Sequence, residues 1–287
     1  MAQGPLNKVT GMRDYTLSLY EKAMPGELSW AEKLAAAKEA GFDAVEISID
    51  ETEQKLARLD WDVQERIELL TLTRKAGVPI HSMCLSGHRK YPLGSSDPAV
   101  RARGLEIAKK AIDFACDLGI SIIMLAGYDV YYEPSTEQTR ALFEENLQRV
   151  THWAAHKGVH LAFETMETSF MNTTKKAMHY VHQINSPYLA VFPDVGNVTN
   201  GTDDVYADIE SGRGHIVAAH LKESKPGIFR DLHYGEGHVD FLQVTDQLRK
   251  MGVALYTAEF WYDPAYLDGN WRGALKEAND SLRIYLD

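Results

Sequence analysis

An alternation of apolar runs and helical segments recurs along almost the whole chain, and it constrains the fold more than any other feature. Each unit has an apolar run, then a polar loop, then a segment with apolar positions at three- and four-residue spacing, and the units recur about every 35 residues. The apolar runs predict eight strands, at Tyr15–Tyr20, Asp43–Ile49, Val78–Leu85, Ile120–Leu125, Val159–Glu164, Tyr188–Asp194, His215–Leu221 and Ala254–Phe260. The intervening segments predict helices at Ser29–Ala40, Trp61–Ala76, Asp97–Leu118, Thr136–Lys157, Thr173–Ile184, Asp203–Ser211, Phe241–Met251 and Trp271–Tyr285.

Glycines mark the boundaries between these helices and strands. Gly41, Gly77, Gly119, Gly158 and Gly252 each follow a helical segment and precede an apolar run, which is where a left-handed residue ends a helix. Continuously apolar strands that alternate with helices form parallel sheets covered by helices. We therefore predict a polar N-terminal extension at residues 1–14 and a single (β/α)8 TIM-barrel domain at residues 15–287. A doubly wound open sheet is the alternative.

Composition restricts the partners and the location. The net charge of −11 argues against a nucleic-acid partner, because binding to phosphate backbones requires a basic surface. No apolar run reaches the roughly 18 residues of a membrane-spanning helix, and the N-terminus lacks the apolar core of a signal peptide. The two cysteines, Cys84 and Cys116, form no disulfide framework. We expect a cytoplasmic protein without a membrane partner, and a homodimer as the commonest assembly.

Four consecutive predicted strands end in ionisable side chains. They are Glu164, Asp194, His220 and Glu259, in the fifth to eighth strands. The carboxyl ends of barrel strands meet at the end of the barrel that carries active sites. Carboxylates that converge in desolvated surroundings need a counter-charge, so we predict one divalent metal ion. Mn²⁺, Mg²⁺, Co²⁺ and Zn²⁺ all suit three carboxylates and one imidazole. Taken singly, each residue could instead form a salt bridge or a helix cap.

The segments around these four residues resemble the metal site of the xylose isomerase-like TIM barrels, and more narrowly that of the ketose 3-epimerases. Further segments resemble the L-ribulose-5-phosphate 3-epimerases, also called L-xylulose-5-phosphate 3-epimerases, of L-ascorbate utilisation. These segments are Tyr20-Glu-Lys-Ala, Ser82-Met-Cys-Leu-Ser-Gly-His-Arg, Tyr91-Pro-Leu-Gly-Ser, Leu125-Ala-Gly-Tyr-Asp-Val-Tyr-Tyr, Phe192-Pro-Asp-Val-Gly-Asn and Lys225-Pro-Gly-Ile-Phe. The likeness extends from Tyr15 to Tyr285.

The resemblance implies metal-dependent epimerisation at C3 of a ketopentose phosphate, L-ribulose 5-phosphate or L-xylulose 5-phosphate. Such a reaction removes the C3 proton on one face of the sugar and returns a proton on the other, through an enediolate. The resemblance implies that Glu164 and Glu259 are both bases and metal ligands, and that Asp194 and His220 are ligands only. Glu46, in the second strand, either hydrogen-bonds a ligand or forms a structural salt bridge.

Further polar residues near the strand ends are candidates for binding the substrate and its phosphate. Arginine suits a bidentate grip on phosphate, and the loop from Gly235 to Gly237 offers backbone N–H groups. Each cation could equally belong to a solvated surface. The predicted substrate-binding residues are His88, Arg89, Asn197, Lys222 and Lys225. By the resemblance, Asn197 stands where epimerases of unphosphorylated sugars have a histidine, which disfavours a free ketose as substrate.

Other functions remain open at this point. An aldose–ketose isomerase or a free-ketose 3-epimerase of the same fold would also use a metal and carboxylates. An apurinic-site endonuclease would need more strand-end histidines and a basic groove, which the net charge of −11 disfavours. A sugar-phosphate-binding protein without turnover is a further alternative. It would need no proton acceptors on the two faces of the ligand, so the presence of both Glu164 and Glu259 argues against it.

Overall fold

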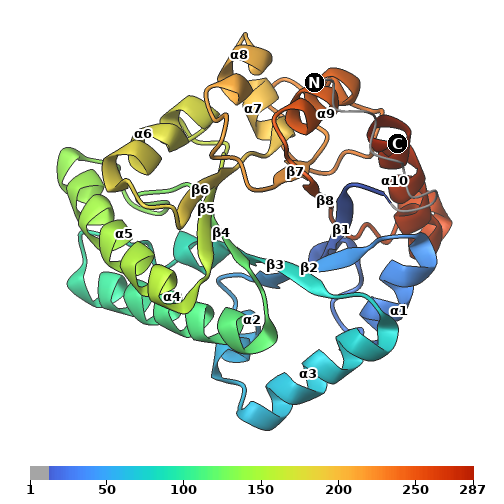
Figure 1. Cartoon of the computed structure of the whole chain (residues 1–287), viewed down its shortest axis with the longest axis horizontal. Coiled ribbons are helices and arrows are strands. Elements are labelled where there is room, and N and C mark those ends of the chain that lie inside the picture. Colours follow the sequence, from blue (N-terminus) through green and yellow to red (C-terminus); the bar gives the residue numbers. More distant parts are fainter. Residues whose placement is uncertain (1–12) are drawn as a thin grey trace, which may run out of the picture.

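The structure, a computed structural model, describes residues 13–287 and has a ring of strands enclosed by helices (Figure 1). The extension predicted at residues 1–14 lies outside the described residues except for its last two. The strands are β1 (Thr16–Tyr20), β2 (Ala44–Ile49), β3 (Ile80–Leu85), β4 (Ile122–Ala126), β5 (His160–Glu164), β6 (Leu189–Phe192), β7 (Ala219–Leu221) and β8 (Leu255–Ala258).

All neighbouring strands are parallel, in the order β6-β5-β4-β3-β2-β1-β8-β7. The two outermost strands of this order, β6 and β7, are joined by the parallel bridges Val191–Ile216 and Asp194–His220. These bridges close the sheet into a barrel. The predicted (β/α)8 fold is therefore confirmed, and the open doubly wound sheet is wrong.

Ten α-helices are assigned within residues 13–287, and all eight predicted helices are present with small changes at their ends. The bounds are α1 (Trp30–Ala40), α2 (Glu53–Leu56), α3 (Val63–Ala76), α4 (Pro98–Leu118), α5 (Glu137–Lys157), α6 (Thr174–Ile184), α7 (Val195–Gly201), α8 (Val205–Glu210), α9 (Phe241–Lys250) and α10 (Trp271–Leu286). Within this part of the chain, no helix has both the length and the apolar content needed to span a membrane.

The sequence did not predict α7, and its origin explains why β6 is shorter than expected. Pro193 has no N–H to donate to a neighbouring strand, and β6 ends just before it, at Phe192. The side chain of Asp194 then accepts hydrogen bonds from Gly196 N and Asn197 N, at 2.8 and 3.1 Å. Such a cap starts a helix even though the segment is rich in residues with low helix propensity.

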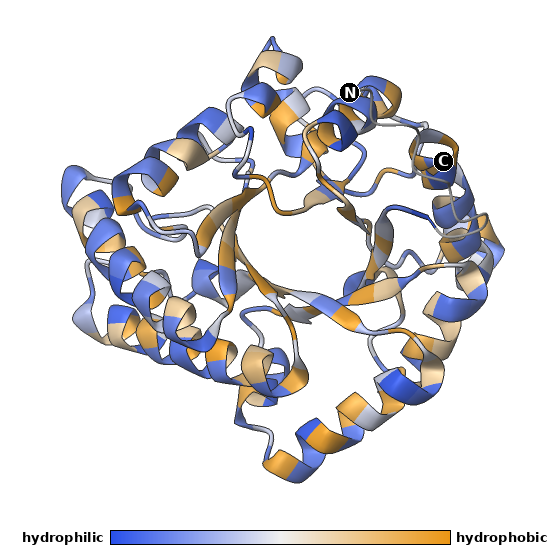
Figure 2. Ribbon diagram, viewed as in Figure 1, coloured by the Kyte–Doolittle hydropathy of each residue, from blue (hydrophilic) through white to orange (hydrophobic). Residues whose placement is uncertain are grey.

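Apolar side chains fill the barrel beneath the carboxyl ends of the strands. Met124 and Phe192 are fully buried there, together with Ile122 and Cys84. Figure 2 shows apolar residues along the strands and polar residues on the outer surfaces of the helices. The barrel therefore has a packed apolar floor, and polar groups above this floor lie in surroundings that exclude most water.

A buried ionic cluster fixes the turn that follows β1. The carboxylate of Glu21 accepts hydrogen bonds from Lys33 at 2.7 Å, Lys55 at 2.5 Å and Arg58 at 2.6 Å, and from the backbone N–H of Ser48 at 2.9 Å. Burial alone would raise the pKa of Glu21, but the three cations outweigh it and hold this pKa well below its usual value. The cluster ties β1, α1 and α2 together at the carboxyl end of the barrel.

We expect Glu21→Gln to lower the free energy of unfolding at pH 7 by about 3–5 kcal/mol, because it leaves buried cations without a carboxylate. The pKa of Glu21 is lower in the folded protein than in the unfolded chain. The stabilisation is therefore fully present above the unfolded pKa of about 4.3, and it declines progressively as the pH falls from there through the lower pKa of the folded state. Urea unfolding of both proteins at a series of pH values measures this difference.

The control for this prediction is Glu53→Gln, which removes an exposed carboxylate that lies 3.6 Å from Lys90. An exposed pair of this kind contributes little to stability, so we expect an unchanged unfolding midpoint. Equal midpoints for Glu21→Gln and Glu53→Gln at pH 7 would contradict the role given to the buried cluster.

Candidate active site

Four ionisable side chains converge above the apolar floor of the barrel. Glu164 ends β5, Asp194 follows β6, His220 lies in β7 and Glu259 follows β8. Each is 5% exposed or less. Each offers one possible metal-ligand atom, and these atoms all lie within 4.8 Å of one another. The structure thus brings together the four residues that the sequence singled out as metal ligands.

His220 lies at the centre of this group, with carboxylates at both of its ring nitrogens. Its Nδ1 is 3.1 Å from Glu164 Oε1 and 2.8 Å from Glu259 Oε2. Its Nε2 is 2.7 Å from Glu46 Oε1, and Ser82 donates a hydrogen bond to the other oxygen of Glu46 at 2.6 Å. Glu46 therefore orients the imidazole ring so that Nδ1 faces the two glutamates. In a metal site, a carboxylate in this position fixes the tautomer that presents the other nitrogen to the ion.

The pKa values of the cluster show how strongly it attracts positive charge. Burial lowers the pKa of His220, but the carboxylates of Glu46 and Glu259 outweigh this and raise it well above its usual value. Burial raises the pKa of Glu164, and the charge of Glu259 raises it further. Burial also raises the pKa of Asp194, to about 7. Buried carboxylates in such numbers favour a cation among them, and the donor set fits a divalent metal ion.

Glu259 differs from the other carboxylates of the cluster. Burial raises its pKa, but the charges of Lys222 and His220 outweigh burial and lower the pKa to about 2. Lys222 forms an ion pair with Asp194 and lies 3.8 Å from Glu259 Oε2. The cluster thus contains an ammonium group of the chain itself, close to two of its carboxylates.

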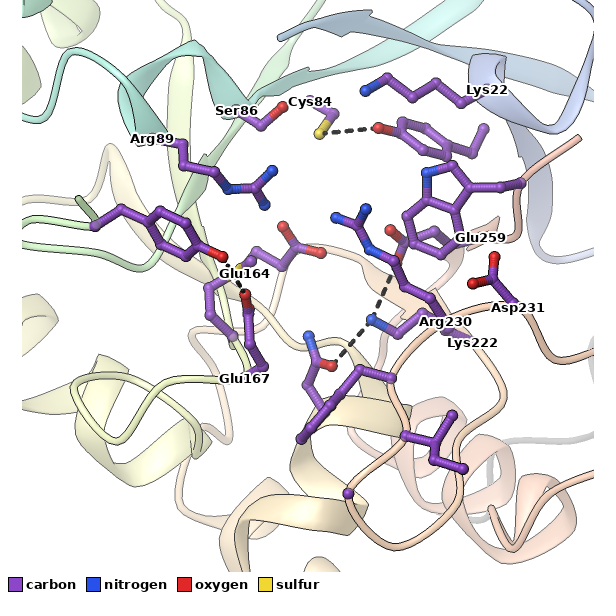
Figure 3. A pocket seen from close by; sticks show the side chains of 18 of the residues that line it. Lys22, Cys84, Ser86, Arg89, Glu164, Glu167, Lys222, Arg230, Asp231 and Glu259 are labelled. Carbon is purple, nitrogen blue, oxygen red and sulfur yellow. Dashed lines mark hydrogen bonds and ion pairs between the residues drawn. The ribbon is translucent and has the colours of Figure 1, made fainter. Parts of the chain in front are cut away.

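A cavity of about 450 Å³ opens above the cluster, and Glu164 and Glu259 reach its floor. Figure 3 shows Arg89 and Arg230 extending toward it from opposite sides, with Lys222 near Glu259. The guanidinium carbon of Arg89 lies 5.0 Å from the ring centre of Tyr131, and that of Arg230 lies 4.7 Å from the ring centre of Trp261. The cavity thus combines an acidic floor with cationic walls.

Three of the five predicted substrate-binding residues line this cavity, namely Arg89, Asn197 and Lys222. Asn197 donates a hydrogen bond to Thr165 O at 2.8 Å and accepts one from Lys222 at 2.9 Å. Its side chain is therefore fixed between β5 and the residue that follows β7.

The structure does not bring His88 or Lys225 to the cavity lining. His88 is buried with Nε2 3.1 Å from Gly104 O, and burial lowers its pKa to about 4. Lys225 lies in a turn in which its backbone exchanges hydrogen bonds with that of Ile228, at 3.0 and 2.8 Å. Both residues were predicted from their distance to a strand end, which does not determine where a side chain points.

The backbone N–H of Gly235, in the loop that we considered for phosphate, already has a partner. Glu223 accepts hydrogen bonds from Gly235 N at 3.1 Å, and also from Val239 N at 3.2 Å and Ser224 N at 3.1 Å. This buried carboxylate holds the long segment between β7 and α9 in place. Glu223 was not singled out from the sequence, because its partners lie up to 16 residues away in the chain.

The sequence reasoning also missed Lys22 and Arg230, which both line the cavity. Lys22 is the second residue after β1 and forms an ion pair with Asp50 at 2.6 Å. A search for charged residues just after the first predicted strand would therefore have found it. Arg230 lies nine residues beyond the end of β7 (Leu221). The motif Lys225-Pro-Gly-Ile-Phe directly before it is the one nearby sequence feature that could have indicated its role.

Comparison with known proteins agrees with this geometry. The family model described as xylose isomerase-like TIM barrel matches residues 34–285. L-ribulose-5-phosphate 3-epimerase UlaE of Salmonella paratyphi A is 46% identical over 250 residues, which cover 87% of this chain and 88% of the relative. The protein of the same name from Salmonella typhimurium is also 46% identical over 250 residues, with the same coverage of both chains.

Two solved structures have the same fold at low sequence identity. D-allulose 3-epimerase from Methylomonas sp. gives a TM-score of 0.77 at 20% identity, covering 96% of this chain and 98% of the other. D-psicose 3-epimerase from Clostridium cellulolyticum H10 gives a TM-score of 0.79 at 16% identity, covering 95% and 99%. From the family model and the Salmonella relatives together, we conclude that the chain belongs to the L-ribulose-5-phosphate 3-epimerase family of xylose isomerase-like TIM barrels.

Proposed function

We propose that the protein interconverts L-ribulose 5-phosphate and L-xylulose 5-phosphate by metal-dependent epimerisation at C3, with Glu164 and Glu259 as the two bases. The observation that carries the proposal is the placement of these two glutamates around His220, with oxygens 3.1 and 2.8 Å from its Nδ1. The family of the chain, with relatives named L-ribulose-5-phosphate 3-epimerase at 46% identity, supports this choice of substrate.

We assign Glu164, Asp194, His220 and Glu259 as the ligands of one divalent cation, Mn²⁺, Mg²⁺, Co²⁺ or Zn²⁺. When bound, such a cation supplies fixed positive charge for the oxyanion that develops beside C3. The chain's own part is to orient the ligands. Glu46 orients His220 at 2.7 Å, and the N–H groups of Gly196 and Asn197 hold one oxygen of Asp194, so that the other oxygen is available to the cluster.

The two glutamates move the proton. One carboxylate accepts the C3 proton on its face of the sugar, and the other carboxylate delivers a proton to the opposite face. The roles reverse for the reaction in the other direction, as they must for a reversible epimerisation. Both glutamates are at most 5% exposed, so little water reaches the reacting carbon during the two transfers. The proton delivered is not the proton removed, and exchange of both carboxyl groups with solvent between turnovers restores their protonation states.

The phosphate is assigned to the cationic walls of the cavity, with Arg89 and Arg230 as its principal partners. Arginine presents several donors in a planar arrangement that matches phosphate. Asn197 and Lys222 lie deeper, beside the cluster, where they can hydrogen-bond the sugar oxygens. The homodimer and the cytoplasmic location expected from the sequence both stay predictions.

The reaction itself is tested by NMR in D₂O with the Mn²⁺-loaded protein and either ketopentose phosphate. We expect deuterium at C3, formation of the other epimer, and no aldose phosphate. An aldose product would instead indicate an aldose–ketose isomerase. As the control, a sample stripped of metal with EDTA should show no exchange until Mn²⁺ is restored, and full turnover in EDTA would contradict the assigned metal centre.

We expect Glu164→Gln and Glu259→Gln each to lower kcat for epimerisation by about 10²–10⁴-fold, because an amide cannot accept the C3 proton. Both variants should remain folded, since glutamine preserves the side-chain shape. Circular dichroism measures folding, and an NMR assay measures kcat. Glu68→Gln removes an exposed carboxylate of α3 and should leave kcat unchanged. Substantial turnover by both active-site variants would eliminate the two-base mechanism.

We expect Arg89→Gln to lower kcat/KM for L-ribulose 5-phosphate by about 10–100-fold, the effect of losing charged hydrogen bonds to the phosphate. The kcat/KM for unphosphorylated L-ribulose should be similar in the wild type and the variant, because the contact that is lost is to the phosphate. The neighbouring variant Lys90→Gln removes an exposed charge that lies outside the cavity lining, and it should leave both values unchanged. An equal loss with both substrates would show that Arg89 does not recognise phosphate.

A further inference from the structure

We propose that Lys222 is an internal counter-cation of the metal centre, which stabilises the metal-free protein and competes with the metal ion for Asp194. This inference rests on the metal centre assigned under the proposed function. It goes further by giving Lys222 control over how tightly the ion is bound.

The position of the ammonium group supports this role. Lys222 is 6% exposed, and its Nζ contacts Asp194 Oδ2 in an ion pair, lies 3.8 Å from Glu259 Oε2 and donates to Asn197 Oδ1 at 2.9 Å. Two of these three partners are assigned metal ligands. A buried lysine is costly unless it is paired, so the chain places a full positive charge among its own acidic ligands.

Asp194 has only one oxygen available for a cation. Its Oδ1 accepts the N–H groups of Gly196 and Asn197 at the start of α7. Its Oδ2 is therefore the oxygen that a metal ion would use, and it is the atom paired with Lys222. The ammonium group and the metal ion thus compete for the same lone pairs, and the two positive charges repel each other when both are close to this oxygen.

The charge balance shows why such a lysine is useful. The carboxylates of Glu46, Glu164, Asp194 and Glu259 are all buried, and the buried cationic side chains in contact with them are His220 and Lys222. Removing Lys222 would increase the excess of negative charge in the metal-free cluster. It would destabilise the metal-free protein and strengthen its attraction for a divalent cation.

A purely structural role for Lys222 predicts the opposite effect on metal binding. If the lysine only held Asp194 and Asn197 in position, its loss would loosen the site and weaken metal binding. The sign of the change in affinity therefore separates the two roles.

The test measures Mn²⁺ affinity by competition with a chelating dye, without substrate, in the wild type and in Lys222→Met and Lys222→Gln. We expect both variants to bind Mn²⁺ at least about tenfold more tightly, the scale of removing one nearby positive charge. The melting temperature of the metal-free variants should fall, while the Mn²⁺-saturated variants should melt close to the wild type. The amide of Lys222→Gln keeps a hydrogen-bond donor toward Asn197. The affinity measurement can therefore rely on this variant if Lys222→Met does not fold.

Two further variants act as controls. Lys225→Met removes the same charge three residues further along the chain, outside the cavity lining, and should leave Mn²⁺ affinity and both melting temperatures unchanged. Lys222→Arg keeps the positive charge and should stay within about threefold of the wild-type affinity, since the charge carries the effect.

Equal or weaker Mn²⁺ binding by Lys222→Met and Lys222→Gln would overturn the inference. That result would leave the proposed function intact as long as the wild type binds Mn²⁺ and turns over the sugar phosphate. Failure of the wild type to bind Mn²⁺, Mg²⁺, Co²⁺ or Zn²⁺ would instead contradict the assigned metal centre itself. The two failures are therefore distinguishable in the same set of titrations.

Discussion

The rest of the site depends on the confinement of negative charge in a space that water hardly enters. Glu46, Glu164, Asp194 and Glu259 are each at most 5% exposed, around the single imidazole of His220. Carboxylates this close repel each other, and burial strengthens the repulsion. The arrangement persists because positive charge lies among them and because the surrounding structure holds each carboxylate in place. A site built in this way can hold a divalent cation among its carboxylates.

The barrel supplies that confinement through its closure. Parallel strands end at the same level, so residues in or just after the last part of β5, β7 and β8 meet without help from long loops. Asp194 reaches the same place by a different route, because Pro193 ends β6 and the aspartate becomes the cap of α7. Its two oxygens then serve two purposes, one holding the helix and the other facing the cluster. Secondary structure and ligand geometry are thus determined by the same residue.

The parts of the site that depend on local sequence pattern could be predicted from the sequence. The eight strands follow from the apolar runs, and the convergence of Glu164, His220 and Glu259 follows from the ionisable residues at the ends of three of these runs. Contacts between distant segments were not predictable in this way. His88 follows β3 closely, yet the short 3-10 helix at Ser86–Arg89 turns it toward Gly104, and no local pattern indicates this direction.

Arg230 is a cavity residue that local sequence pattern could not predict. It lies in the long segment between β7 and α9, which Glu223 ties down through backbone N–H groups as far away as Val239. Its guanidinium group reaches the cavity because it packs against Trp261, which follows β8. The chain as a whole has a net charge of −11 and repels a sugar phosphate at long range. In the function proposed above, local cations such as Arg89 and Arg230 provide the attraction for the phosphate, and the acidic cluster below them binds the metal ion and transfers the protons.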